Sequence, residues 1–203
     1  GRIDFWKFDS VVGGILATPL LRASLDAADV RASLVFIGLG AECGAATLAK
    51  MMHLGADLRE VKVRTRFASQ VGLLHVFAYF GWVEPLRFVL EQGASAATPD
   101  SETHTPLHRA SREGHLDAAA LLLEYSAPVA ASDGVGCTPL HRAASIGHRL
   151  VADLLINHRA PLSTSDNNGM TPLHRAVTSG HCDVVKLLLE RGAMVRGAGS
   201  GKA

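Results

Sequence analysis

The hexapeptide TPLHRA occurs three times in this chain, at residues 105–110, 138–143 and 171–176, and both intervals are 33 residues. An enzyme needs its catalytic group once, in one place, so identical copies at equal intervals favour a repeated structural unit. The same period holds for a leucine, a histidine, a glycine and an alanine, each of which recurs four times: Leu74, Leu107, Leu140 and Leu173; His75, His108, His141 and His174; Gly81, Gly114, Gly147 and Gly180; Ala94, Ala127, Ala160 and Ala193. Agreement at four positions excludes chance, so the fold must be built from these units.

Each unit predicts two short helices. The Thr105 hydroxyl can cap a helix whose first position is Pro106, where a missing amide proton has no cost. Gly114 tolerates the left-handed conformation that follows a helix end, so we expect the first helix to end there. A second helix follows, because apolar residues such as Leu187 and Leu188 recur at helical spacing after each Gly-His pair.

The segments between units are rich in turn-forming residues. PVAASDGVGC at 128–137 and PLSTSDNNGM at 161–170 contain Asp, Asn, Gly and Ser, which favour turns over helix. We expect them to form exposed loops, here called fingers. Two short helices and a turn cannot bury their own apolar face, whereas stacked copies form a continuous core. The sequence therefore predicts a solenoid.

A 33-residue period with Thr-Pro-Leu-His, a Gly-His pair between the helices, a leucine-rich second helix and Gly-Ala before the turn resembles the ankyrin repeat family. The resemblance implies an all-α solenoid of about five stacked helix-turn-helix units, the first one or two of them degenerate. It places the array at residues 34–196, with a degenerate unit at 34–57 and further units at 72–95, 105–128, 138–161 and 171–194. Residues 1–33 form an N-terminal segment whose structure the pattern does not fix, and residues 197–203 form a flexible tail.

The resemblance also gives the repeated histidines a structural role. His108, His141 and His174 are expected to hydrogen-bond within the turn and to tie neighbouring units together. Histidines one unit apart would stand about 10 Å from each other, whereas zinc binds nitrogen at about 2.0 to 2.1 Å. One metal ion cannot bridge them, so we expect no metal site. We also expect no cofactor, for the reasons given below for the glycine-rich segment at 38–44.

The net charge limits which partners are expected, and the cysteine content indicates the compartment. Twenty Lys and Arg against nineteen Asp and Glu leave a formal charge of +1, which gives no electrostatic basis for general nucleic-acid or membrane-surface binding. The longest apolar stretch, residues 33–52, contains Glu42 and several glycines and makes a poor membrane span. Cys43, Cys137 and Cys182 lack disulfide-framework or metal-ligand spacing, so a reducing compartment, cytoplasmic or nuclear, fits best.

The glycine-rich segment GLGAECG at residues 38–44 supports an alternative hypothesis. Glycines after an apolar run can cradle a phosphate at a helix start, and FIGLGAECGAATLA also looks a little like the first motif of small-molecule methyltransferases. Residues 1–66 would then be the remnant of a nucleotide- or S-adenosylmethionine-binding enzyme domain that the array regulates. Gly38 stands where that family usually has an acid, and Glu42 where it has a glycine. Too few residues separate this segment from the repeat at 72 to form a catalytic sheet.

The residue after each motif histidine is an arginine, and stacking would align Arg109, Arg142 and Arg175 along the short-helix side. Of these three, Arg109 has an acid four residues on, at Glu113, whereas the other two lack such an in-helix partner. We therefore expect these arginines to be available to an acidic partner. Alternatively, the arginine stems pack over the next helix and their charged heads stay in water.

The sequence thus favours a non-enzymatic protein–protein interaction module, a scaffold or adaptor that binds a protein partner through the short-helix side and the fingers. Loops on a rigid scaffold carry variable contacts without disturbing the core, and the sequence shows no nucleophile with a base at a recognisable spacing. The candidate partner-binding residues are Arg109, Arg112, Arg142, Arg175, Glu102, His104, Val135, Asn167, Asn168 and Met170.

The last unit has an apolar second helix, like the internal ones. Val184, Val185, Leu188 and Leu189 span more of the helix circumference than one neighbour can cover. The segment RGAGSGKA at 196–203 is too short and too glycine-rich to cover them. Because the chain also begins without Met, we expect further repeats in a longer parent chain, and the alternative is self-association through this end.

Overall fold

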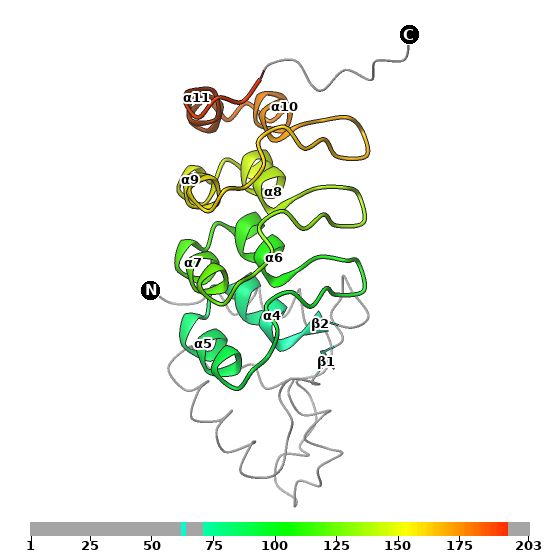
Figure 1. Cartoon of the computed structure of the whole chain (residues 1–203), viewed down its shortest axis with the longest axis vertical. Coiled ribbons are helices and arrows are strands. Elements are labelled where there is room, and N and C mark those ends of the chain that lie inside the picture. Colours follow the sequence, from blue (N-terminus) through cyan, green and yellow to red (C-terminus); the bar gives the residue numbers. More distant parts are fainter. Residues whose placement is uncertain (1–61, 64–70, 195–203) are drawn as a thin grey trace, which may run out of the picture.

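The computed structural model describes residues 62–63 and 71–194, which form a stack of paired helices (Figure 1). The first helices of the pairs are α4 (Leu73–Phe80), α6 (Pro106–Glu113), α8 (Pro139–Ile146) and α10 (Pro172–Thr178). The second helices are α5 (Val83–Glu91), α7 (Leu116–Glu124), α9 (Arg149–Asn157) and α11 (Cys182–Glu190). A short antiparallel pair, β1 (Lys62–Val63) and β2 (Val71–Gly72), precedes them. The all-α solenoid that the repeat predicts is confirmed.

The helices stand in two columns. Figure 1 shows the first helices one above another, beside a second column that holds their partners. Three fingers, residues 95–104, 128–137 and 161–170, extend from the first-helix column, and β1 and β2 lie on the same side. The degenerate unit expected at 34–57, the segment 1–33 and the tail 197–203 lie outside the described residues.

Local sequence sets both ends of each first helix. The hydroxyls of Thr138 and Thr171 accept the backbone N–H groups of His141 and His174 at 3.4 Å. The proline that follows each threonine occupies the first helical position, where no acceptor is needed. Gly147, with a φ of 91°, ends α8 in the left-handed conformation that glycine adopts without strain. The helices are therefore short for reasons that lie in their own sequence.

Leucines of the second helices and small residues of the first helices form one continuous core. Leu122, Leu155 and Leu188 occupy corresponding positions of α7, α9 and α11, and each is 0% exposed. Ser111 and Ala144, on α6 and α8, are also 0% exposed, because the first helix of the following repeat packs against them. Small side chains at these positions let neighbouring first helices approach closely.

Two motif histidines, His108 and His141, each join their own helix to the next finger. Nε2 of His108 donates to the carbonyl of Cys137 at 3.0 Å, and Nε2 of His141 donates to that of Met170 at 3.0 Å. On the other side of the ring, Nδ1 of His108 accepts the backbone N–H of Thr105 at 3.1 Å. One ring therefore satisfies a helix cap and the neighbouring repeat, which is the structural role that the resemblance implies.

A second set of histidines ties the repeats at the opposite end of the first helices. These residues follow the helix-ending glycines, and each donates from Nε2 to a carbonyl of the preceding repeat: His115 to Tyr79 at 3.0 Å, His148 to Arg112 at 2.9 Å and His181 to Ser145 at 3.1 Å. Neighbouring repeats are thus hydrogen-bonded at both ends, and the fingers are carried on a rigid frame.

We expect Leu155→Ala to lower the free energy of unfolding by about 2 to 5 kcal/mol, because the truncation removes contacts of a 0% exposed side chain and leaves a cavity in the core. Asn168→Ala changes an exposed finger residue and should alter the same quantity by at most about 0.5 kcal/mol. Chemical denaturation followed by circular dichroism measures both. A larger cost at Asn168 than at Leu155 would show that the buried and exposed faces are assigned wrongly.

Candidate partner-binding face

Each finger is built around an aspartate that the sequence reading did not single out. In the second finger, Oδ1 of Asp133 accepts the backbone N–H groups of Val135 and Cys137 at 3.0 and 2.9 Å, and its own N–H donates to the Cys137 carbonyl at 2.9 Å. Asp100 and Asp166 make the same contacts in the first and third fingers. The aspartate closes the loop. Its signal was present in the sequence, since these three residues are also spaced by the repeat period.

The second oxygen of each aspartate binds the arginine of the following first helix. Nε of Arg142 donates to Oδ2 of Asp133 at 2.9 Å, and the corresponding pairs are Arg109–Asp100 at 2.5 Å and Arg175–Asp166 at 2.8 Å. The structure therefore corrects the expectation that these arginines have no acidic neighbour, while their contact with a binding partner stays a prediction. Each guanidinium binds an aspartate nine residues earlier in the chain. This aspartate lies in the finger, and the i,i+4 rule for ion pairs applies only within a helix.

In these ion pairs the aspartate side chain is buried and the arginine side chain is partly exposed to solvent. The three aspartate side chains are 0% exposed, whereas the arginine side chains are 10% exposed at Arg109, 23% at Arg142 and 31% at Arg175. Burial acts against ionisation of Asp133, but hydrogen bonds from Arg142 and from the finger backbone outweigh it and hold the pKa of this carboxyl below its usual range. The face presents neutralised ion pairs rather than free cations.

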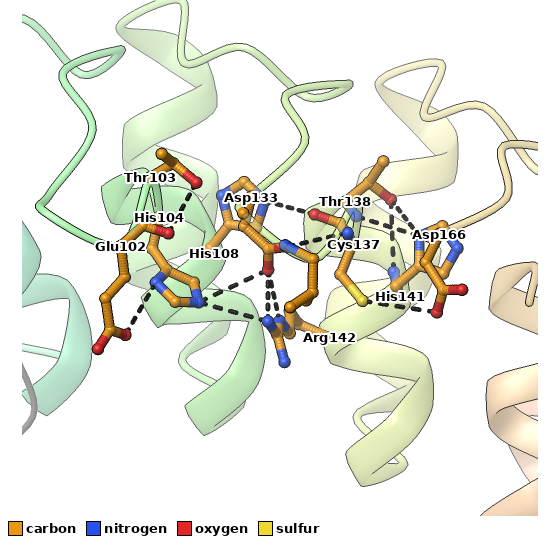
Figure 2. A network of polar contacts seen from close by, with 12 residues as sticks. Glu102, Thr103, His104, His108, Asp133, Cys137, Thr138, His141, Arg142 and Asp166 are labelled. Atoms are coloured by element: carbon orange, nitrogen blue, oxygen red, sulfur yellow. Dashed lines mark hydrogen bonds and ion pairs between the residues drawn. The ribbon is translucent and has the colours of Figure 1, made fainter. Parts of the chain in front are cut away.

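His104 lies between two of these ion pairs, Arg109–Asp100 and Arg142–Asp133. Figure 2 shows its ring beside the second pair. Its Nε2 is 3.5 Å from Oδ2 of Asp133 and 3.3 Å from a terminal nitrogen of Arg142. In the next unit the corresponding residue is Cys137, whose thiol points at Asp166 from 3.8 Å. The residue before the motif threonine therefore contacts the aspartate of the next finger. His104 belongs to the framework of the face rather than to its tips.

Other predicted residues lie at the finger tips and are exposed. Glu102, Val135 and Asn168 stand two residues after the aspartate in the first, second and third fingers. The second and third fingers are in contact, because the backbone N–H of Asn167 donates to the Val135 carbonyl at 3.1 Å and its side-chain amide to that of Gly134 at 3.3 Å. The structure thus brings the tips of these two fingers together.

Met170 and Arg112 complete the predicted set. Met170 is half-buried at the position that corresponds to Cys137, and its carbonyl accepts the hydrogen bond from His141. The Arg112 side chain is 51% exposed on α6, and its contact with Glu113 is long, at 3.8 Å. Among the four predicted arginines, Arg112 is the most exposed.

Within residues 62–63 and 71–194, no group of three His, Cys, Asp or Glu side chains could hold a metal ion. No helix in that part of the chain has the length and apolar character needed to cross a membrane. The glycine-rich segment at 38–44, on which the alternative of a nucleotide- or S-adenosylmethionine-binding remnant rests, lies outside the described residues. That hypothesis stays a prediction.

Comparison with known proteins agrees with this geometry. A family model described as ankyrin repeats (3 copies) matches residues 39–133 and 128–196, which together make up most of the chain. A search of the curated proteins finds no match. The matched residues include every helix pair described above and the fingers between them.

Mild acid should destabilise the array through its buried histidines. Burial lowers the pKa of both His75 and His108 to about 4, whereas a histidine in an unfolded chain takes up its proton near pH ~6.5. The unfolded state therefore binds protons first, and stability is lost as the pH falls from about 6.5 to about 4, by about 3 kcal/mol for each ring. Urea denaturation across this range measures the loss, and a flat profile would contradict neutral buried rings.

Arg142→Gln should lower the free energy of unfolding by about 1 to 3 kcal/mol, because it leaves the 0% exposed carboxylate of Asp133 without its guanidinium. Arg112→Gln is the matched control and should cost about 0.5 kcal/mol or less, since this side chain is 51% exposed. Thermal and chemical denaturation of the two variants give the comparison. Equal costs would mean that Arg142 is an ordinary surface cation.

Proposed function

The chain belongs to the ankyrin-repeat family, and from this premise we propose that it binds a protein partner along its finger tips and acts by binding rather than by catalysis. Ankyrin repeats indicate a protein–protein interaction module. We further propose which surface of the array binds the partner and the chemistry of that contact. A reducing compartment, cytoplasmic or nuclear, is part of the proposal, because Cys137 and Cys182 are both free thiols.

The observation that carries the proposal is the contrast between the framework of the fingers and their tips. The finger aspartate and the motif threonine, histidine and arginine are identical in three units, and the fold itself uses their side chains. The tips between them read SET at 101–103, GVG at 134–136 and NNG at 167–169, and most of these residues are exposed. Side chains that make no framework contact, such as those of Val135 and Asn168, can vary to suit a partner.

The tips offer a mixed surface. Glu102 is acidic, Val135 is apolar and 50% exposed, and the third finger presents the amide of Asn168 beside that of Asn167, which already donates to the Gly134 carbonyl. A partner that covers the row must therefore combine an apolar contact with hydrogen-bonding groups. We propose that these contacts supply most of the affinity.

An acidic partner remains part of the proposal in a more limited form. Its carboxylates could reach Arg112 and the outer edges of Arg142 and Arg175. At the last two they would share a guanidinium with a finger aspartate, so the gain is smaller than for a free cation. This part of the binding should weaken as salt is added, because exposed charges are screened.

Photo-crosslinking at single positions tests which side of the array binds. A photoreactive amino acid at Val135, on the second finger, should capture the partner, and the same amino acid at Leu150, 68% exposed on α9, is the matched control. The captured protein is then titrated against Val135→Asp and Leu150→Asp. We expect Val135→Asp to weaken binding about tenfold or more and Leu150→Asp to leave it unchanged. The reverse result would place the partner on the second helices and overturn the proposal.

We also propose self-association of the array through the open side of its last described repeat. Val177 on α10 stands where Ser111 and Ala144 are fully buried by a following helix, yet it is 59% exposed, and Leu189 on α11 is 46% exposed. An apolar surface shaped to receive a repeat can be covered by the same surface of a second copy. Light scattering should then show dimers that Val177→Lys abolishes, whereas a monomer at every concentration would contradict this.

A further inference from the structure

His104 occupies a position where the following units have Cys137 and Met170. Its side chain is 13% exposed, and its backbone carbonyl accepts the hydrogen bond from Nε2 of His75 at 2.9 Å. The backbone of this residue is therefore fixed by the repeat that precedes it, while its ring reaches toward the second finger. Neither the hydrogen-bonded framework of the repeats nor the proposed partner contacts require an imidazole here.

Charged or titratable groups from four elements face this ring. They are Asp100 at 3.5 Å and Glu102 at 3.6 Å from the same finger, Arg109 at 3.5 Å and the ring of His108 at 6.0 Å between centroids from α6, Asp133 at 3.5 Å from the second finger, and Arg142 at 3.3 Å from α8. Three carboxylates thus stand against two guanidinium groups. With both imidazoles neutral, the group carries one excess negative charge.

The two protonation states of the ring make different contacts. A neutral imidazole has one N–H, so it can donate to one of the two aspartates, and its other nitrogen can accept from an arginine. A protonated ring has an N–H on both nitrogens, so it can no longer accept from Arg109 or Arg142. It can instead donate through Nδ1 to Asp100 and through Nε2 to Asp133, each at 3.5 Å. Its positive charge also cancels the excess negative charge around it. Protonation therefore strengthens the connection between the first and second fingers.

We propose that His104 is a proton-sensitive clasp that fastens the first finger to the second when its ring is protonated. The two carboxylates that it joins belong to adjacent repeats, so the clasp acts on the spacing of the finger tips. It does not depend on the proposed partner, because all the groups involved belong to this chain.

The neighbouring groups leave a pH window in which the clasp can be measured. At about pH 5.5 the rings of His75 and His108 stay largely neutral, because burial lowers the pKa of each to about 4. Burial acts against ionisation of the two aspartates, but their hydrogen bonds outweigh it and hold the pKa of both Asp100 and Asp133 below the usual range. Both carboxylates are therefore charged when the imidazole is protonated.

The first test compares the wild type with His104→Gln by urea denaturation at about pH 8 and about pH 5.5. Glutamine keeps a neutral hydrogen-bonding side chain but cannot take up a proton. We expect the unfolding equilibrium constant of the variant, relative to wild type, to rise about two- to fivefold at the lower pH, the range of a single ion pair. His158→Gln changes an exposed histidine after α9 and should show no such rise. An equal ratio at both pH values for His104→Gln, or an equal rise in the control, would overturn the proposal.

Hydrogen exchange in the wild-type chain gives a second test that does not require the variant to fold. The amides of Val135 and Cys137 bond to Oδ1 of Asp133. Mild acid lowers the protection of the whole array through its buried histidines, so the expected signal is a ratio: the protection factors of these two amides, relative to those of Asn168 and Met170 in the third finger, should rise about two- to fivefold when the pH falls from about 8 to about 5.5. The corresponding amides of the third finger face a thiol instead of an imidazole and serve as the internal control. The same change in both fingers would contradict the assignment to His104.

Discussion

A neutral imidazole shared by two repeats is the contact on which the rest of the array depends. Nδ1 of His108 accepts the backbone N–H of Thr105, the N-cap residue of its own helix, and Nε2 donates to the Cys137 carbonyl in the next finger. Each of these hydrogen bonds contributes about 0.5 to 1.5 kcal/mol net, but losing one would leave a buried polar group without a partner, which costs about 1 to 3 kcal/mol. The start of a helix and the position of the neighbouring finger are therefore fixed together, and the repeat period follows from this pairing.

The Asp–Arg pairs extend the same principle into the fingers. Asp133 uses one oxygen to close its loop and the other to bind Arg142 on the following helix. A loop held by its own helix does not need its tip residues for stability, so Val135 can be exposed without loss of order. The face thus separates two tasks, since the framework is supported from within and the tips stay free for contact. His104 connects one supported finger to the next.

Most of the fold could be predicted from the sequence because the chemistry of the repeat is local. Thr138 and Gly147 mark the ends of α8 by properties of single residues, and Leu155 marks the buried face of α9 by spacing. The contacts of the candidate site were harder to predict from the sequence. Arg142 meets Asp133 across a helix–loop boundary, and the rules for ion pairs within a helix do not cover that geometry. The contacts of His104 with Arg142 and of Cys137 with Asp166 join residues 29 positions or more apart in the chain, so they emerge from the stacking of repeats and not from any local pattern.

The protonation state of the motif histidines tests the shared neutral imidazole most directly. Long-range proton–nitrogen NMR spectra at neutral pH report which ring nitrogen carries the proton. For His108 and His141 we expect a single tautomer with the proton on Nε2, an unprotonated Nδ1, and ring signals that do not change as the pH is lowered through about 6.5. A proton on Nδ1, or rings that titrate as free histidine does, would contradict the account of how these repeats are joined.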